Sequence, residues 1–549
     1  MLLHIGRRPS FWPGMSKRKL HQFLYDNFPA KMRPVIQLNT QEDRLRRLLL
    51  DVSQSINDSK LTIQPVIVRW AGGWVRDKLL GIESHDIDVA INAMTGFDFA
   101  QRMREYCSTE KASRIHAIKP DDIGNLHNIS KNPDKSKHLE TAMVRIFGLD
   151  LDLVNLRKET YAEDSRNPTV EFGTAEEDAL RRDATINAFF YNIHTDEIED
   201  FTGGMRDLTA KVLRTPLNPL ETFKDDPLRV LRLVRFASRL GFSIEEETRK
   251  VMSHPEVLDA LQVKISRERV GTELEKMLKG NNPRSALELI DQLCLYHAVF
   301  TDFSSKSTTR PDSSRWHVAY KCLDSLVRRR SPGSLGELLI RPGEANYVAW
   351  ILAALSPWMV VEPPLNNVRK ANVLPPPAVA AREGFKAPNK LVDIMTGSYR
   401  NRREIIRMKT SLCNEEGAVL ARDTLGMAIR RWDSYGGPWT LQVLSALLVE
   451  AMESQDAWTE LDTEKDNFMT GWQKFLDLII ELDVYDAPAI KRLLDGRSLA
   501  MALGVKPGKW TGKALDLCLA WQFRNPQETD PRGAIEEIQR QRDELGVPR

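Results

Sequence analysis

Hydrophobic and polar positions follow a clear order in one short stretch of the chain. The apolar run Val66–Val68 predicts a buried strand, which the glycines Gly72 and Gly73 interrupt. The next residues, Trp74–Gly81, have helical spacing, and His85–Ile91 returns to β-branched and apolar residues. The pattern therefore predicts a strand, a glycine turn, a helix and a second strand in succession.

The pattern changes after about residue 218. Short strand-like and helical segments alternate before it, whereas long helical patterns such as Pro227–Phe242 and Ala286–Phe300 dominate after it. The uncharged run Ala345–Val361 is shorter than the ~20 apolar residues of a membrane span and predicts a buried helix that ends near its proline. Clustered prolines at Val361–Val379 predict a linker. We expect a multidomain chain with an α/β head, a small mixed sheet with helices, and an all-α remainder.

One polar segment interrupts the head. Ser108–His138 is rich in Lys, Asn and Asp and shows little periodicity. A loop of this length inside a compact domain is usually functional or disordered. We therefore expect a flexible loop over residues 108–138.

Composition limits the number of domains, the kind of charged surface and the state of the cysteines. A chain of 549 residues is long enough for several domains. The formal net charge is only +2, so any nucleic-acid-binding surface must be a local basic one. Five cysteines without CxxC pairs predict reduced structural thiols rather than disulfides or zinc. They are Cys107, Cys294, Cys322, Cys413 and Cys518.

The leader, residues 1–35, is basic and partly apolar. Up to Ala30, Arg7, Arg8 and three further basic residues face a single acidic residue, Asp26. Such a leader resembles a mitochondrial presequence, with a disordered basic arm as the alternative. Met15 is a candidate second start that would remove part of it. We expect the mitochondrion and the cytoplasm as locations, with the nucleus as an alternative.

Two aspartates with one residue between them, Asp86 and Asp88, lie in the second predicted strand. Residues i and i+2 of a strand point to the same face, where two carboxylates repel each other unless a cation is present. Carboxylates at a strand end suit Mg²⁺, with substrate phosphates completing its coordination. Two such ions can activate a hydroxyl and stabilise a leaving pyrophosphate. A polar strand end is the alternative explanation.

The preceding glycine turn can hold a triphosphate. Gly72 and Gly73 allow the backbone to approach a ligand closely, and the helix that starts near Trp74 directs free N–H groups at an anion. Arg76 is available for a phosphate oxygen. A plain turn would explain the glycines alone, but their combination with the two aspartates predicts a nucleotide site.

The sequence GGWVRD followed by DID resembles the first motif of the nucleotidyltransferase superfamily, whose fold is shared with DNA polymerase beta. More narrowly, it is similar to the class II tRNA nucleotidyltransferases, the CCA-adding enzymes, of eukaryotic type. Further motifs of this family follow in order between about residues 65 and 280. The resemblance implies that Asp86 and Asp88 are catalytic and bind the metal.

The sequence ALRRDATINA resembles the family's RRDxTINA motif, which recognises the ribose and the nucleotide. Arg181 and Arg182 offer fixed positive charge to phosphate groups. Asp183, Thr185 and Asn187 can hydrogen-bond a ribose 2′-hydroxyl. Without the resemblance, the polar face of a helix would explain these residues equally well.

The sequence DDPLRVLRLVRF resembles the family's EDxxR motif, with Asp225 where many members have Glu. Asp226 and Arg229 are three residues apart, which would place them on one helix face. A carboxylate and a guanidinium match the amino group and ring nitrogen of cytosine and adenine, whereas uracil and guanine present the reverse pattern. Each unpaired group would cost ~1–3 kcal/mol. We expect this pair to act as a protein template, with an ordinary ion pair as the alternative.

Three arginines continue that helix, and two further motifs follow the family order. Arg232, Arg235 and Arg239 either contact phosphates or form a solvated face, and we assign Arg232 to nucleotide binding. DFTGGMRDL resembles the family's glycine hinge at Gly203 and Gly204, with a plain turn as the alternative. SRERVGTELEKML resembles the last motif, and its apolar face predicts a mainly structural helix.

A further acidic pair lies between these motifs. Lys137–Arg157 predicts two paired strands in which Asp150 and Asp152 share one face. Family members often carry an acidic residue at the position of Asp152, which is therefore either a third catalytic carboxylate or an exposed strand position. The resemblance also implies that the preceding loop, Ser108–His138, helps the enzyme switch from adding C to adding A.

The resemblance divides the chain into a leader over 1–35, a catalytic head over 36–200, a helical neck for nucleotide selection over 201–282, and a helical body and tail that bind tRNA over 283–549. Several basic runs in the last part either contact the tRNA backbone or form solvated helix faces. They are VRRRS from Val327, SYRNRREIIRMK from Ser398, and Arg430–Arg431.

The resemblance implies template-independent addition of C, C and A to the 3′ end of tRNA from CTP and ATP, with Mg²⁺ as cofactor. The expected partners are tRNA, bound through its acceptor stem and elbow, and the two nucleotides, with no membrane, and we expect a monomer. The alternatives are a CC-adding, A-adding or poly(A) polymerase relative. A non-catalytic RNA-binding protein on a transferase head is an alternative from another class, against which the presence of both aspartates argues.

Overall fold

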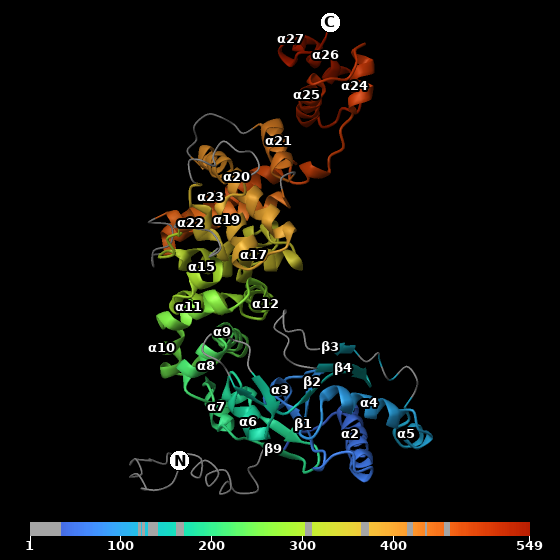
Figure 1. The fold of residues 1–549 in the computed structure, drawn as a ribbon. Helices are drawn as coiled ribbons and strands as arrows, with labels where there is room; N and C mark the ends of the chain where they lie inside the picture. The colour runs from blue at the N-terminus through green and yellow to red at the C-terminus, as the bar shows by residue number, and fades with distance from the viewer. Residues whose placement is uncertain are drawn as a thin grey trace. The chain divides into compact units, whose positions relative to one another are not determined.

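A computed structural model shows two compact units, Met1–Ala260 and Leu261–Arg549 (Figure 1). The structure describes residues 35–118, 122, 124, 127–129, 141–160, 169–301, 310–363, 373–413, 421–433, 436–454 and 462–548. The predicted leader lies outside this description apart from Val35. The unit boundary falls inside helix α11 (Pro255–Lys264), within the range of the predicted neck.

The first unit is built on a mixed sheet of seven strands in the order β3-β4-β5-β2-β1-β8-β9. The central pair β2 and β5 is parallel, and the other neighbouring strands of this sheet are antiparallel. The strands are β1 (Val68–Ala71), β2 (Asp86–Ile91), β3 (His127–Ile129), β4 (Thr141–Ile146), β5 (Leu149–Asn155), β8 (Phe190–Asn192) and β9 (Glu197–Glu199). The predicted order of strand, glycine turn, helix and strand is confirmed as β1, Gly72, α3 (Gly73–Leu79) and β2, but β1 shares only Val68 with the predicted strand Val66–Val68.

Helix α2 (Thr40–Asp58) begins with a capping box between Asn39 and Glu42, and its apolar stripe is buried. An aromatic cluster fixes β1 to α3, since Trp70 and Trp74 have ring centroids 4.7 Å apart and Tyr191 of β8 packs on both. This packing positions the glycine turn between them.

Part of the expected loop 108–138 has regular structure, which corrects that prediction. Helix α4 (Gly96–Cys107) is followed by α5 (Glu110–His116), which is capped by the Thr109 side chain and buries Ala112 and His116. Strand β3 then pairs with β4. A helix of two turns and a strand of three residues are too short to show periodicity in the sequence. The remaining positions of this segment lie outside the described residues.

The first unit continues with two small sheets and short helices. A hairpin joins β6 (Arg157–Thr160) to β7 (Thr169–Phe172), and β10 (Val212–Leu213) pairs with β11 (Ser243–Ile244). The helices are α6 (Ala175–Leu180), α7 (Gly204–Ala210), α8 (Pro219–Asp225), α9 (Leu228–Leu240) and α10 (Glu246–Met252), and a 3₁₀ turn, η4, covers Thr185–Asn187.

The described part of the second unit is helical, as predicted. Its longer helices include α12 (Arg267–Leu278), α13 (Pro283–Gln292), α15 (Trp316–Arg328), α17 (Glu344–Ala354), α20 (Asn389–Cys413), α21 (Arg422–Asp433), α22 (Trp439–Glu453), α23 (Asp462–Glu481), α25 (Trp510–Arg524) and α26 (Arg532–Arg540). The shorter ones are α14 (Tyr296–Phe300), α16 (Leu335–Leu339), α18 (Ser356–Met359), α19 (Pro376–Val379), the π-helical turn η6 (Ala380–Gly384), the 3₁₀ turn η7 (Ala487–Ala489), α24 (Gly496–Ala502) and α27 (Arg542–Leu545). The C-terminal helices share a separate core around Trp510, Cys518 and Ile538.

Several predictions for the second unit are confirmed. The uncharged run forms the buried helix α17, which ends before Pro357, and α18 follows it. Within the described residues, the search for a helix long and apolar enough to cross a membrane finds none. The predicted linker Val361–Val379 is wrong at its end, because α19 occupies Pro376–Val379. Cys107, Cys294, Cys322 and Cys518 are free thiols, as expected.

Candidate active site

Strands β2 and β5 bring four aspartates together at the ends where both strands begin. The two strands are parallel and in register, with Asp86 opposite Asp150 and Asp88 opposite Asp152. Asp86 and Asp88 are exposed while Ile87 between them is buried, as their alternation predicts. Asp152 therefore lies beside Asp88 on the same face. Asp150 is exposed and pairs with Arg145 at 3.6 Å across to β4.

The electrostatics of these aspartates indicate an excess of negative charge. Asp88 is accessible, but the protein around it reduces its hydration, and this raises its pKa. The charge of Arg182 lowers the pKa and the charge of Asp86 raises it, and the net shift is upward. Burial and the charges of Asp88, Asp86 and Asp150 raise the pKa of Asp152 to about 6. The face therefore favours a bound cation. Among the described residues, no three His, Cys, Asp or Glu side chains form a ready metal site.

Gly72 is the residue on which the turn depends. Its backbone has φ +69° and ψ −125°, a conformation that side-chain-bearing residues rarely adopt. A Cβ at this position would lie 2.7 Å from Nη1 of Arg182 and 3.3 Å from Oδ2 of Asp88. The missing side chain therefore lets a guanidinium and a carboxylate approach the same Cα. Gly73 is less constrained, since its Cβ would meet only Nη2 of Arg76 at 3.6 Å.

Arg76, which we predicted to be available for a phosphate oxygen, is buried in the structure. It is 2% exposed, its Nε donates to Oδ1 of Asp77 at 2.8 Å, and its Nη1 donates to Oδ1 of Asn187. Burial lowers the pKa of this guanidinium, which its contact with Asp77 opposes. Arg76 lies on the inward face of α3, so it has two protein partners instead of the predicted phosphate, and it fixes the position of Asn187.

The predicted ribose-sensing residues form a buried network, with one exception. Asn187 donates through Nδ2 to Oδ1 of Asp183 at 3.0 Å, and Arg232 of α9 donates through Nε to Oδ2 of Asp183 at 2.6 Å. Burial alone would raise the pKa of Asp183, but Arg232 and Asn187 lower it to about 2, so its carboxylate is ionised. Thr185 is the exception, because its hydroxyl, although also buried, donates to Oδ2 of Asp207 at 2.8 Å and not to this network.

Asp178 is a site residue that we did not predict. It is 1% exposed and accepts from Nη2 of Arg181 at 2.7 Å and from Nε of Arg182 at 3.1 Å. Burial raises its pKa, but the two arginines outweigh this effect and lower it. Arg182 also donates through Nη1 to the carbonyl of Asn187 at 3.0 Å. Asp178 thus orients both arginines, and the i, i+3 and i, i+4 spacing in DALRR is the signal that could have identified it.

Asp226 and Arg229 do not share a helix face, which corrects our prediction. Helix α8 ends at Asp225 and α9 begins at Leu228, so Asp226 lies at the break with φ −133° and ψ 95°. The residue before a proline avoids the helical region, and Pro227 is the physical reason for the break. Asp226 instead accepts from the Leu228 N–H through Oδ1 at 3.2 Å.

Arg229 is mostly buried at 8% exposure. Its Nη2 donates to the carbonyl of Arg181 at 2.7 Å, and its Nη1 donates to the carbonyl of Thr222 at 3.3 Å. The guanidinium is therefore held by backbone carbonyls of the RRD motif and of α8. This placement brings the two predicted nucleotide-recognition motifs into contact.

Two of the next three arginines of α9 bind carboxylates of the first unit. Arg232 binds Asp183, and Arg239 contacts Oδ2 of Asp77 at 3.0 Å. Arg235 lies over the ring of Phe236, with its guanidinium carbon 4.4 Å from the ring centroid. Arg232 and Arg239 thus have carboxylate partners while staying partly exposed, and the assignment of Arg232 to nucleotide binding stays a prediction.

The glycine pair before α7 makes a close contact. Gly203 has φ +76°, and a Cβ on Gly204 would lie 2.4 Å from the carbonyl oxygen of Thr185. The carboxylate of Asp200 accepts from the Gly204 and Met205 N–H groups, each at 2.9 Å. A packed turn therefore explains these glycines, and the hinge stays a prediction.

The apolar face of α12 in the second unit is confirmed. Val270, Leu274 and Met277 are buried, and Arg267 donates through Nη1 to the carbonyl of Ala298 at 2.8 Å. This helix is therefore a structural element of the second unit.

Comparison with known proteins gives matches over most of the chain. The family described as Poly A polymerase head domain matches residues 68–214, and the one described as probable RNA and SrmB-binding site of polymerase A matches residues 241–306. The chain is 60% identical to nucleotidyltransferase lcsQ of Purpureocillium lilacinum, over 97% of this chain and 98% of that protein. It is 38% identical to the mitochondrial CCA tRNA nucleotidyltransferase of Saccharomyces cerevisiae, over 90% of this chain and 92% of that protein.

The chain belongs to the CCA tRNA nucleotidyltransferase family. The fold agrees with this membership, since the solved structure of a CCA-adding enzyme in an apo form matches with a TM-score of 0.58 at 19% identity, covering 94% of this chain and 98% of that one. The head-domain match, residues 68–214, contains Gly72, Asp86, Asp88, Asp152 and the RRD motif of this chain. It ends before Asp226, so the template pair is outside it.

Proposed function

We propose that this protein adds C, C and A to the 3′ end of tRNA from CTP and ATP without a nucleic-acid template. The observation that carries the proposal is the parallel register of β2 and β5, which places Asp86, Asp88 and Asp152 on one face beside Gly72 and Arg182. The relative from Saccharomyces cerevisiae, which matches this chain over nearly its whole length, is named a CCA tRNA nucleotidyltransferase.

The site fits divalent cations, with Mg²⁺ as our assignment. Asp86 and Asp88 supply exposed carboxylates, and burial together with neighbouring carboxylates raises the pKa of Asp88 and Asp152, an effect that a bound cation would oppose. Asp86 and Asp88 would hold the metal, and Asp152 is the candidate third carboxylate. When bound, Mg²⁺ would activate the tRNA 3′-hydroxyl and stabilise the charge of the leaving pyrophosphate.

The other residues of the site bind and orient the nucleotide. The turn at Gly72 and Gly73 would hold the triphosphate, and Arg182, held by Asp178, supplies fixed positive charge beside Asp88. Asp183 is ionised, so it can accept a hydrogen bond from a ribose hydroxyl near Asn187. Arg76 and Arg232 act by holding Asn187 and Asp183 in place.

Selection of the base is assigned to Asp226 and Arg229. Their chemistry accepts the donor and acceptor pattern shared by cytosine and adenine and rejects that of uracil and guanine. Because the two residues lie on either side of a helix start, the spacing of their groups depends on the backbone at Pro227. This pair is the protein template of the proposal.

The partners and locations follow from the same assignment. We propose that helices of the second unit bind the acceptor stem and elbow of tRNA, and that the protein acts as a monomer. The relatives from Candida glabrata and Saccharomyces cerevisiae are both named as mitochondrial enzymes. With the basic leader, this supports the mitochondrion as one location, with the cytoplasm and nucleus as further ones.

The test is nucleotide addition by the purified full-length protein. A tRNA transcript ending at the discriminator base is incubated with Mg²⁺ and CTP, ATP, both, UTP or GTP, and products are resolved at single-nucleotide length. We expect two additions with CTP alone and one more when ATP is present. The Asp88→Asn variant should lose at least ~1,000-fold in rate, because the activated nucleophile and leaving group lose a ligand of their metal.

Asp150→Asn is the matched control for Asp88→Asn, since Asp150 is on the neighbouring strand and pairs with Arg145 at the surface. It should keep near-normal activity. A stop after two additions with ATP present would mean a CC-adding enzyme, and extension only of a transcript ending in CC would mean an A-adding one. A long ladder of A would mean a poly(A) polymerase. No addition at all would favour a non-catalytic RNA-binding protein.

A further inference from the structure

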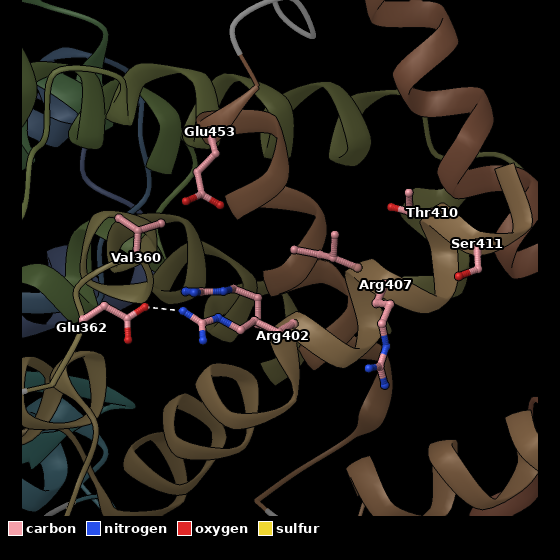
Figure 2. Close-up of a pocket in the computed structure, with 9 residues that line it drawn as sticks. Val360, Glu362, Arg402, Arg407, Thr410, Ser411 and Glu453 are labelled. Atoms are coloured by element: carbon pink, nitrogen blue, oxygen red, sulfur yellow. Dashed lines mark hydrogen bonds and ion pairs between the residues drawn. The ribbon is translucent and has the colours of Figure 1, made fainter. Parts of the chain in front are cut away.

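A pocket in the second unit is lined by one face of α20 and by the end of α22 (Figure 2). Its volume is about 450 Å³, which is enough for a phosphate group with part of an attached sugar. Arg402, Arg403 and Arg407 of α20 line it, with the carboxylates of Glu362 and Glu453 on the other side. Figure 2 shows Arg402 extending from α20 toward these two carboxylates.

Arg402 is buried and makes no ion pair with a described residue, although the carboxylates of Glu453 and Glu362 lie near enough to favour its charged form. Its side chain belongs to a residue that is only 6% exposed, and Nη1 is buried with no hydrogen bond to any described residue. No ion pair of Arg402 is present within the described parts of the chain, and its one aromatic contact is with the ring of Tyr399 at 5.5 Å. A buried charged group is costly unless it is paired and hydrogen-bonded. This guanidinium therefore indicates that an anion completes the site.

The pocket offers further donors for that anion. Arg407 is exposed and has no ion-pair partner among the residues with described positions. Thr410 lies one turn further along α20, so its hydroxyl is on the same side of the helix. Arg403 is paired with Glu362, but both side chains are largely exposed, at 75% and 63%. Surface pairs of this kind contribute little, so an anion can attract Arg403 away from its partner.

The charge of the lining decides which anion fits. Three arginines and two glutamates give a net charge of +1, which matches a singly charged group. A phosphodiester carries one negative charge, whereas free phosphate or a triphosphate carries more and would be repelled by Glu362 and Glu453. Guanidinium groups bind phosphate oxygens through paired hydrogen bonds.

We propose that the Arg402 pocket binds one phosphodiester group of the tRNA backbone. This assignment rests on the proposed function, and it names a phosphate contact of the second unit that is independent of base identity. The run SYRNRREIIRMK, for which a solvated face was the alternative, would then contact RNA through Arg402 and Arg407.

The test compares Arg402→Met with wild type in the full-length protein. Methionine keeps most of the volume without the charge, so the melting temperature should be unchanged or raised. The Kd for a tRNA transcript should rise about 5- to 20-fold, and the slope of log Kd against log salt should fall by about 1, because one phosphate contact is lost. The KM for tRNA should rise with kcat unchanged. Arg382→Gln removes one charge at the surface of the same unit and should change none of these values.

Two further variants distinguish a loss of tRNA binding from a folding defect. Arg407→Gln is exposed and should weaken tRNA binding by a smaller factor without lowering the melting temperature. Glu453→Gln removes a repelling carboxylate and should tighten tRNA binding. If Glu453→Gln instead lowers the melting temperature without changing affinity, Glu453 is the partner of Arg402 in solution and the proposal is overturned.

The remaining outcomes separate this proposal from the proposed function. Wild-type protein that binds tRNA and adds nucleotides, with Kd unchanged in Arg402→Met and Arg407→Gln, would overturn the pocket assignment alone. Inorganic phosphate that raises the melting temperature of wild type but not of Arg402→Met would show a site for free phosphate and overturn the diester assignment. Wild-type protein that neither binds tRNA nor adds nucleotides would overturn the proposed function and this assignment with it.

Discussion

Because Gly72 has no side chain, Arg182 and Asp88 can both approach its Cα in the glycine turn. We expect Gly72→Ala to lower kcat/KM for CTP at least ~10-fold and to reduce stability by about 1–3 kcal/mol, because the backbone is strained and Nη1 of Arg182 must move. The measurements are single-nucleotide addition and the free energy of unfolding.

Gly81 provides the matched control for that substitution. It also has a positive φ, of +70°, but a Cβ there would meet no described atom within 4 Å. Gly81→Ala should cost about 1 kcal/mol of stability and leave kcat/KM unchanged. Equal losses of activity in both variants would mean that backbone strain, and not the crowding at Arg182 and Asp88, explains the requirement for glycine.

Asp152 gives a pH-dependent prediction for the metal-free protein. Its folded pKa is raised to about 6, so the folded state binds more protons than the unfolded state between its ordinary pKa of 3.8 and 6. Its contribution is therefore neutral below pH 3.8 and becomes destabilising as the pH rises to about 6. With EDTA at pH 7.5, Asp152→Asn should be about 1–2 kcal/mol more stable than wild type, and the difference should disappear below pH 4.

Adding Mg²⁺ at pH 7.5 checks the cause of that difference. Wild type should gain more thermal stability than Asp152→Asn if Asp152 contributes to cation binding. Wild type that is already as stable as Asp152→Asn in EDTA at pH 7.5 would contradict the raised pKa.

At the scale of elements, the break between α8 and α9 sets the position of the base-selecting carboxylate. Pro227 keeps Asp226 out of the helical region and starts α9 directly after it. In Pro227→Ala, we expect the two helices to join more easily and Asp226 to move relative to Arg229. The ratio of kcat/KM for CTP to that for UTP should fall about 3- to 10-fold, since each unpaired group supplies ~1–3 kcal/mol of discrimination.

Pro219→Ala is the control for the effect of losing a proline. Pro219 is also buried and begins a helix, α8, in the same unit, but it follows Asn218 and does not precede the selecting carboxylate. It should lower stability slightly and leave nucleotide discrimination intact. An unchanged CTP to UTP ratio in Pro227→Ala would argue that the spacing of Asp226 and Arg229 does not depend on this break.

At the scale of the whole molecule, the two compact units contain different proposed sites. The first unit holds every residue assigned to the nucleotide, from Gly72 to Arg232, and the second holds the Arg402 pocket. Multidomain chains often unfold in separate steps. Leu447→Ala, in the fully buried centre of α22, should destabilise the second unit by about 3 kcal/mol.

Hydrogen exchange followed by mass spectrometry resolves this effect by segment. In Leu447→Ala, peptides from residues 261–548 should exchange faster, while those from residues 35–260 should not change. Leu231→Ala in α9, which is also buried, should give the reverse pattern. Faster exchange of both units in either variant would mean that the chain unfolds as one cooperative body.

Local patterns in the sequence determined much of this protein. The alternation at Asp86 and Asp88, the glycine turn and the apolar face of α12 were predicted, because periods of two and 3.6 residues are properties of neighbouring positions. The break at Asp226 was also readable from its proline, but the spacing to Arg229 suggested a shared helix face instead. The two-turn helix α5 lacked enough residues to show a period.

Only the tertiary structure decided which side chains meet. Asp152 lies beside Asp88 because β5 pairs with β2 in one of several possible registers. Arg76 is bound to Asn187, 111 residues away, and Arg232 to Asp183, 49 residues away, so arginines that suggested phosphate ligands hold other protein groups. Arg402 is one of several arginines in a basic run, and what distinguishes it is its burial, with no hydrogen bond from Nη1 to a described residue. Charge can be read from the sequence, but whether a charge is neutralised depends on long-range packing, and that packing determines which arginines remain for a ligand.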